Sequence, residues 1–203
     1  MHATRPAEGD PEGALVLLHG RGTSEDDILP LADELDPDRR LTAIAPRGPL
    51  SLPPGGSHWY QVRSVGYPGP ETFLPTFELL SGWLDALDTP IDRTVIAGFS
   101  QGAVMAYALG LGEGRPRSAA IVALSGFMPS VDGFALDTDD LDGYPVAIGH
   151  GTFDPVIDAS FGRDARDRLE HAGADVLWRE SPVAHTVDPD FFPELASFVR
   201  RAV

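Results

Sequence analysis

Residues Val95 to Ala106 read VIAGFSQGAVMA, and this stretch decides how the rest of the chain is interpreted. A short apolar run leads into the pentapeptide from Gly98 to Gly102, which matches the pattern G-x-S-x-G, and a helical pattern follows. A serine on a sharp turn between a strand and a helix is the usual setting of a nucleophile. Three fixed positions also occur by chance in many proteins, so Ser100 can equally be a turn hydroxyl until the remaining chain is considered.

Short apolar runs alternate with longer helical patterns on both sides of this stretch. The runs are almost continuously apolar, which is typical of a parallel sheet covered by helices on both faces. This alternation predicts an α/β fold with right-handed crossovers and a mostly parallel central sheet. The predicted strands are Ala14–Leu18, Leu41–Ala45, Thr94–Ala97, Ala119–Leu124, Pro145–Gly149 and Asp175–Trp178, and the predicted helices cover about 25–36, 73–88, 101–111, 159–172 and 190–202.

A chain of 203 residues is long enough for one domain with a sizeable core and short for two. Two irregular segments, Pro46–Pro70 and Gly126–Gly143, are long for plain connections, but neither is large enough for a lid domain. Residues 1–12 are polar and are expected to be poorly ordered. Because no secretory signal or membrane-spanning stretch is visible, we expect a soluble, cytoplasmic protein.

The composition excludes several classes of chemistry. The formal net charge is −16, and all 15 basic residues are arginine. Without lysine there is no Walker A loop, no Schiff-base lysine and no Ser–Lys dyad, and without cysteine there is no thiol nucleophile, thiolate zinc site or disulfide. Nucleic acid and anionic membranes are poor partners for such an acidic surface. Both a GC-rich genome and adaptation to high salt would explain the acidity.

A serine hydroxyl is a weak nucleophile without a base, so one of the six histidines is required if Ser100 does chemistry. His185 lies in a loop after the last predicted strand and before the last helix, which suits a general base. His19 and His150 directly follow strands in His-Gly pairs, and we expect them to orient loops through backbone hydrogen bonds. His58 lies in an aromatic loop, where it is either solvated or in contact with substrate.

The acid that orients the base should follow an earlier strand, in the chain order Ser, Asp, His. Asp154 follows the strand that ends at Gly149, and Pro155 favours an extended backbone for it, so that its side chain can project from the loop. Asp158 is a rival carboxylate, but its place at the start of the next helix favours a capping role. The sequence therefore predicts a Ser100–His185–Asp154 triad.

Acyl transfer also needs donors for the tetrahedral oxyanion. The backbone N–H of Gln101, directly after the nucleophile, is one candidate. The second should come from the loop Leu18–Gly22, where the N–H of Arg21 is the first choice and that of Gly20 the second. An ordinary glycine-rich turn before a helix is the alternative interpretation of this loop.

These motifs together resemble the phospholipase/carboxylesterase family of α/β-hydrolases, which includes the acyl-protein thioesterases. The resemblance runs from about Ala14 to Val199, and Gly-Phe-Ser-Gln-Gly-Ala at 98–103 with His-Gly-Arg-Gly at 19–22 carries most of it. Further matches are Ala45–Gly48, Trp59-Tyr60, His150-Gly151 with Asp154, and His185. It implies an α/β-hydrolase fold without a lid domain, a serine hydrolase of esters or thioesters without cofactor or metal, the same triad, and Arg21 and Gln101 as oxyanion donors.

The chain departs from the family pattern at two places. Ala184 stands before His185, where a glycine is more common, and Gln61–Pro70 does not match the thioesterases that act on proteins. We therefore expect a carboxylesterase of small to medium acyl esters, with an acyl thioesterase or lysophospholipase as the alternative. A catalytically silent binding module is a third hypothesis, and homodimerisation is left open. Trp59, Phe99 and Phe153 are candidates for the acyl pocket, although aromatic residues usually pack in the core.

Overall fold

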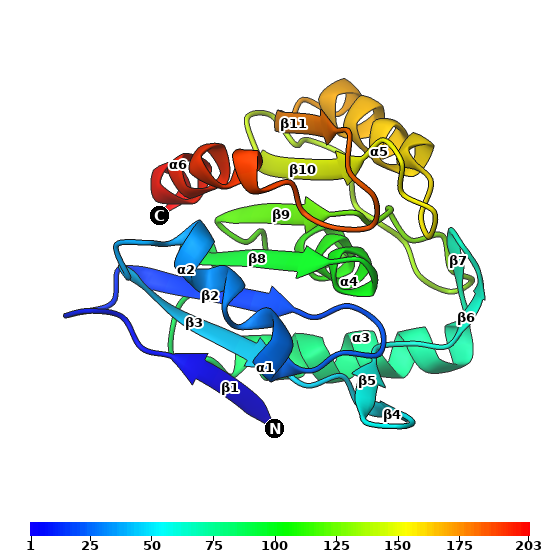
Figure 1. Cartoon of the computed structure of the whole chain (residues 1–203), viewed down its shortest axis with the longest axis horizontal. Coiled ribbons are helices and arrows are strands. Elements are labelled where there is room, and N and C mark those ends of the chain that lie inside the picture. Colours follow the sequence, from blue (N-terminus) through cyan, green and yellow to red (C-terminus); the bar gives the residue numbers. More distant parts are fainter.

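Seven strands form one sheet in the order β1-β3-β2-β8-β9-β10-β11, in a computed structural model that describes residues 1–203 (Figure 1). Only β1 is antiparallel to its neighbour; every other neighbouring pair is parallel. The strands are β1 His2–Arg5, β2 Gly13–Leu18, β3 Leu41–Pro46, β8 Thr94–Phe99, β9 Ala120–Leu124, β10 Pro145–Gly151 and β11 Asp175–Ser181. The mostly parallel α/β sheet predicted from the apolar runs is confirmed.

Helices cover both faces of this sheet. One apolar cluster joins the sheet to α3, α4 and α5, and a second joins the opposite face to α1, α2 and α6. Neighbouring residues of a central strand enter different clusters: Leu15 and Leu17 of β2 pack on one face, and Val16 and Leu18 on the other. Burial on both faces explains why the strands are apolar without alternation. The helices are α1 Glu25–Ile28, α2 Leu31–Leu35, α3 Pro70–Asp85, α4 Gln101–Leu111, α5 Ala159–His171 and α6 Phe192–Ala202, with short 3₁₀ turns at Ile91–Arg93 and Pro189–Phe191.

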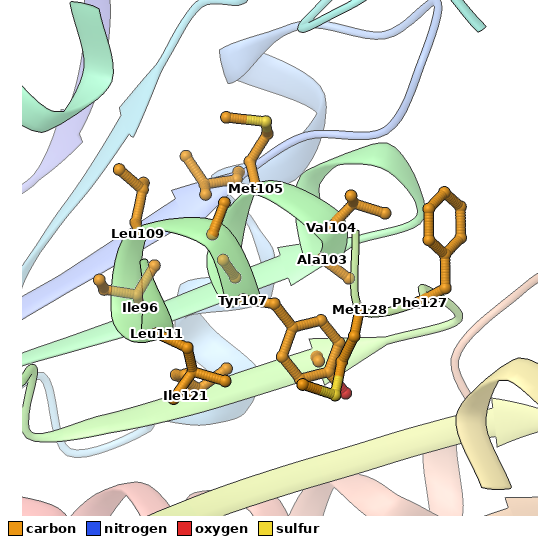
Figure 2. Close-up of a cluster of buried hydrophobic side chains, with 14 of the residues drawn as sticks. Ile96, Ala103, Val104, Met105, Tyr107, Leu109, Leu111, Ile121, Phe127 and Met128 are labelled. Carbon is orange, nitrogen blue, oxygen red and sulfur yellow. The ribbon is translucent and has the colours of Figure 1, made fainter. Parts of the chain in front are cut away.

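Helix α4 has no solvent-facing side, because every residue from Gln101 to Leu111 is buried. Figure 2 shows its side chains packed among residues of the sheet and of the segment that follows β9, including Ile121, Phe127 and Met128. A helix buried all round is held by packing on every side. The first turn of α4, which follows Ser100, is therefore fixed by the core.

The helix predicted at 25–36 is interrupted. Helices α1 and α2 are separated by Leu29 and Pro30, because proline has no N–H to continue the hydrogen bonds of the helix. At the start of α1, the Ser24 hydroxyl and backbone N–H both donate to the carboxylate of Asp27, at 2.7 and 2.8 Å.

The N-terminal segment differs from its prediction, since residues 1–12 are not simply a poorly ordered tail. Residues His2–Arg5 form β1, and the guanidinium of Arg5 is buried. It donates to the carboxylate of Asp36 at 2.6 Å and to the carbonyl oxygens of Ala32, Asp36 and Leu41. This order depends on partners far along the chain, so the local polarity of the segment does not reveal it.

The two irregular segments hold little regular structure. Residues 46–70 form two small hairpins, in which β4 Leu50–Leu52 pairs with β5 Gly56–His58 and β6 Val62–Ser64 pairs with β7 Tyr67–Pro68. Residues 126–143 contain turns and isolated bridges but no helix or longer strand. None of the helices combines the length and the apolar character that crossing a bilayer requires.

Strand β11 forms one edge of the sheet and carries charge along it. Glu180 accepts from the Nε of Arg163 on α5 at 2.8 Å, and Arg179 donates to Glu194 on α6 at 2.6 Å. These ion pairs connect the edge strand to a helix on each face.

Candidate active site

The residues predicted to do chemistry meet at the carboxyl ends of the parallel strands, where α/β folds usually place their sites. His19 follows β2, Ser100 follows β8, Asp154 follows β10 and His185 follows β11. These strands lie in the inner part and at one edge of the same sheet. Parallel pairing brings their loops to one side of the molecule (Figure 1).

Ser100 has a backbone conformation that non-glycine residues rarely adopt, with φ 55° and ψ −118°. Its N–H donates to the carbonyl of Leu124 at 2.8 Å, which helps to hold the strained turn. The turn also requires close backbone approach: a Cβ at Gly102 would lie 1.9 Å from the carbonyl oxygen of Leu18, and one at Gly98 would lie 2.3 Å from the carbonyl carbon of Gly102. The glycines of the G-x-S-x-G pattern are thus needed for packing helix, strand and turn together.

The side chains of Ser100, His185 and Asp154 form a continuous hydrogen-bonded row. His185 Nε2 lies 2.9 Å from the Ser100 hydroxyl, and His185 Nδ1 lies 2.6 Å from a carboxylate oxygen of Asp154. With the proton on Nδ1, the imidazole donates to Asp154 and accepts from Ser100. The structure therefore brings together the three residues that the sequence singled out, in an arrangement that can move a proton from the hydroxyl to the ring.

The carboxylate of Asp154 is held from both oxygens. One accepts from His185, and the other accepts from the N–H groups of Val156 and Ile157 at 2.8 and 2.9 Å. Burial alone would raise the pKa of this carboxyl, but the hydrogen bonds from His185, Ile157 and Val156 outweigh it and lower the pKa below its usual value. Asp154 thus stays ionised beside the imidazole.

Two backbone N–H groups stand as candidate oxyanion donors. Gln101 is the first residue of α4, so its N–H has no acceptor within the helix, and the helix dipole favours negative charge there. The N–H of Arg21, in the turn after β2, is not used by any hydrogen bond within the protein. Both residues line the same cavity as Ser100.

That cavity has a volume of about 100 Å³ and a mainly apolar lining that includes Ser100. Apart from Arg21, Ser100 and Gln101, its lining residues were not predicted from the sequence. The Gly66 turn, with φ 87°, marks the β6–β7 hairpin that supplies part of the wall, and a turn signal of this kind could have located it. The lining residues are Arg21, Tyr60, Val62, Val65, Ser100, Gln101, Phe127, Val156 and Ile157.

The three aromatic residues predicted for the acyl pocket lie elsewhere. Trp59 is fully buried, and its indole N–H donates to the carbonyl of His19 at 2.8 Å. The Phe99 ring packs against the imidazole of His185, with ring centroids 4.9 Å apart, and Phe153 is 66% exposed. None of the three lines the cavity. Trp59 packs in the core, Phe99 contacts the imidazole of His185, and Phe153 is exposed to solvent. The residue type alone does not tell these three environments apart in a sequence.

The loop-orienting histidines behave as predicted. His19 bonds through Nδ1 to the carbonyl of Gly20 at 2.7 Å and accepts through Nε2 from the N–H of Gly48 at 2.9 Å. His150 bonds through Nε2 to the carbonyl of Ile157 at 2.8 Å. His58 differs from its prediction, because it is buried, bonds through Nδ1 to the carbonyl of Tyr60 and does not line the cavity at Ser100. Asp158 caps α5 by accepting from the N–H of Ser160, as expected.

No group of three or more His, Cys, Asp or Glu side chains is arranged to hold a metal ion. The polar groups around Ser100 are the imidazole, the Asp154 carboxylate and backbone N–H groups. The chemistry that these groups can support is nucleophilic attack by a hydroxyl with general-base assistance.

Comparison with known proteins places the chain in a family. The family model described as Phospholipase/Carboxylesterase matches residues 2–203. The chain belongs to this family. As a member of the phospholipase/carboxylesterase family, the protein is an enzyme that acts on ester or thioester bonds.

Individual relatives agree with this assignment. An acyl-protein thioesterase 1 of Candida albicans is 26% identical over 98% of this chain and 96% of its own length. An acyl-protein thioesterase 1 of Yarrowia lipolytica is 30% identical over 80% of this chain and 78% of its own. The crystal structure of the Bacillus cereus carboxylesterase superposes with a TM-score of 0.85 at 24% identity, covering 100% of this chain and 94% of that one. The predicted α/β-hydrolase fold is thereby confirmed.

Proposed function

We propose that the protein is a serine carboxylesterase that hydrolyses small to medium acyl esters through an acyl-enzyme. The hydrogen-bonded row from Ser100 through His185 to Asp154 is the observation that carries this proposal. His185 takes the proton of Ser100 as its oxygen attacks the ester carbonyl, and Asp154 holds the ring and stabilises its charged form. The N–H groups of Arg21 and Gln101 then stabilise the oxyanion of the tetrahedral intermediate.

The second half of the reaction reverses these roles. The imidazolium of His185 gives its proton to the leaving alcohol as the C–O bond breaks, which leaves the acyl group on Ser100. A water molecule, deprotonated by His185, attacks the carbonyl carbon of the acyl-enzyme. The ring then passes this proton to the Ser100 oxygen as its bond to the acyl carbon breaks, which releases the carboxylic acid and restores the enzyme. The cycle starts with His185 neutral, so that it can take the proton, and with Asp154 ionised, so that it can stabilise the imidazolium.

The cavity supports short acyl groups. Its volume of about 100 Å³ offers an apolar chain contact with Val62, Val65 and Phe127 beside Ser100. Val62 and Val65 belong to a hairpin whose outer side is exposed, so a long chain would extend past it into solvent.

An acyl thioesterase is the second candidate function. Relatives that are named acyl-protein thioesterases reach 30% identity, and the same attack on a carbonyl carbon serves a thiolate leaving group. A panel of matched acyl esters and acyl thioesters from acetyl to octanoyl would rank the two functions by kcat/KM.

The decisive experiment compares wild type with Ser100→Ala on p-nitrophenyl acetate and butyrate. We expect wild type to turn over both esters and to be labelled by a fluorophosphonate probe, and Ser100→Ala to lose both properties. Ser197→Ala, an exposed serine on α6, is the matched control and should keep them. Undiminished turnover by Ser100→Ala would refute the mechanism.

A further inference from the structure

The side chain of Gln101 is engaged in a way that its backbone role as an oxyanion donor does not require. It is buried at the first position of α4, and both ends of its amide are bonded to one distant segment. Its Oε1 accepts from the N–H of Trp59 at 2.8 Å, and its Nε2 donates to the carbonyl of Tyr60 at 2.7 Å. A buried amide that is hydrogen-bonded at both ends fixes two segments relative to each other, because either bond would be costly to lose.

Trp59 carries this connection onward to the loop after β2. Its indole N–H donates to the carbonyl of His19 at 2.8 Å, and its ring packs on the His19 imidazole, with centroids 4.7 Å apart. Trp59 and His19 are both completely buried. The aromatic residue expected in the acyl pocket therefore lies behind the site, against the loop that holds the second oxyanion donor.

His19 in turn sets the orientation of one peptide unit. Its Nδ1 donates to the carbonyl of Gly20 at 2.7 Å, and the Thr23 hydroxyl donates to the same oxygen at 2.9 Å. The carbonyl of Gly20 and the N–H of Arg21 belong to the same planar peptide, and in a trans peptide they point in opposite directions. Fixing the carbonyl therefore aims the N–H of Arg21.

From these contacts we infer that Gln101 and Trp59 are positioning residues that tie the two oxyanion donors together. Gln101 holds one donor on its own backbone, and its side chain reaches through Trp59 and His19 to the peptide that carries the other. We call this series of contacts the Gln101–Trp59 bridge. Without it, the Arg21 donor would depend on an exposed turn flanked by Gly20 and Gly22.

The bridge should affect the transition state more than the bound substrate. Oxyanion donors contribute where charge develops on the carbonyl oxygen, and removing one outright typically costs about 10²- to 10³-fold in kcat. Loosening a donor should cost less than removing it. We expect a fall in kcat of about 10- to 100-fold with little change in KM. This inference rests on the proposed esterase function.

Two variants test the bridge at different contacts. Trp59→Phe removes the indole N–H and keeps a ring against His19. Gln101→Met removes both hydrogen bonds of the side-chain amide and keeps a side chain of similar volume. The rate with p-nitrophenyl butyrate is measured well below the unfolding temperature and divided by the number of active sites titrated with a fluorophosphonate. A loss of folded protein then does not lower the measured kcat. Trp178→Phe is the matched control, a partly buried indole packed beside Arg166 on α5, and should keep wild-type kcat.

A trifluoromethyl ketone gives the readout that separates positioning from mere stability, because it forms a tetrahedral adduct on Ser100 with a charged oxygen. Its affinity should fall in proportion to kcat in both variants, while KM stays within about 3-fold of wild type. The double variant should lose little more kcat than the more impaired of the two single variants, since both substitutions act through one connection.

Unchanged kcat per titrated site in Trp59→Phe, with only a lower unfolding temperature, would overturn the inference. A higher KM at constant kcat would overturn it as well. If Gln101→Met does not fold, Trp59→Phe alone decides. A wild-type protein that neither reacts with the fluorophosphonate nor cleaves esters would instead refute the proposed function, which keeps the two failures distinct.

Discussion

Helix α4 and the β6–β7 hairpin border the same cavity, yet they are built in opposite ways. The helix contributes Gln101 from a segment that is buried along its whole length, whereas the hairpin contributes Val62 and Val65, which are 49% and 38% exposed. The helix side is held by core packing and buried polar contacts. The hairpin side has two very short strands that pair only with each other.

This difference suggests that the rigid helix side serves the chemical step and the exposed hairpin side serves contact with the substrate. In the proposed mechanism, the groups that bond the oxyanion or move the proton must be held in place, and two of their residues, Ser100 and Gln101, are buried where β8 meets α4. Under the proposed function, the wall that would meet the acyl chain lies on a small exposed element, where local opening costs little free energy. Substitutions on the helix side should therefore change kcat or folding, and those on the hairpin side should change the choice of acyl chain.

Asp154→Asn should have the largest effect on catalysis. The neutral amide cannot stabilise the imidazolium and can favour the wrong tautomer of His185, so we expect kcat to fall by about 10⁴-fold while the fold is kept. Steady-state kinetics with p-nitrophenyl butyrate measures this loss. Asp158→Asn is the control, because that carboxylate only caps α5, and it should stay within a few-fold of wild type.

Gly102→Ala tests the packing on the helix side. Its Cβ would lie 1.9 Å from the Leu18 carbonyl oxygen, so the helix or strand must shift, and we expect a loss of about 3 kcal/mol or more in the free energy of unfolding. Gly82→Ala in α3 is the matched control. A Cβ at Gly82 meets nothing within 4 Å, and the substitution should stabilise the protein by about 0.5–1 kcal/mol. Urea denaturation gives both values, and equal effects would contradict the comparison.

Val65→Ala probes the hairpin side. A smaller side chain in the wall enlarges the proposed acyl-binding cavity. The ratio of kcat/KM for octanoyl over butyryl esters should therefore rise by up to about 10-fold, with kcat for the butyryl ester changing less. Leu79→Ala removes an exposed apolar side chain on α3 that does not line the cavity, and it should leave the ratio unchanged. A lower ratio in Val65→Ala would show that the hairpin does not limit chain length.

His19 gives the smallest expected effect, through the pH dependence of stability. Burial lowers the pKa of its imidazole below the usual value, and this outweighs the bond to Gly20 and the nearby acidic groups that act the other way. The unfolded state therefore takes up a proton as the pH falls below about 6.5, before the folded state does, and stability declines from that pH downward.

Unfolding free energies from pH 7.5 to 5 measure this decline, whose slope for one proton is at most about 1.4 kcal/mol per pH unit. His19→Gln should be less stable at neutral pH and should have a shallower slope. Ser197→Ala, which changes no titratable group at an exposed position on α6, should retain the wild-type slope. An unchanged slope in His19→Gln would assign the decline to other groups.

Much of the fold and the three-residue row could be predicted from local pattern. The central strands are buried on both faces, so a short apolar run is enough to locate each, and the strand-turn-helix setting at 94–111 located Ser100. His185 and Asp154 followed from their places after strands, because parallel strands deliver their loops to one edge. The boundaries were accurate to a few residues in most elements, with the break at Pro30 as an exception.

What could not be predicted depends on contacts between distant segments. Strand β1 is stabilised by pairing with β3 and by the buried Arg5–Asp36 ion pair, and its own sequence is polar. The burial of Trp59 and the exposure of Phe153 follow from where their loops pack, not from residue type. Val62 and Val65 were missed because a hairpin this short leaves little periodic signal.

The charged edge of β11 bears on how the protein behaves when it is crowded. The outer strand of a sheet presents unpaired backbone groups that can template pairing with another chain, and charged side chains along it oppose this. Hydrogen bonding from Arg163 lowers the pKa of Glu180, so its charge persists into mildly acidic solution. Charge held on this outer strand opposes its pairing with the edge of another chain.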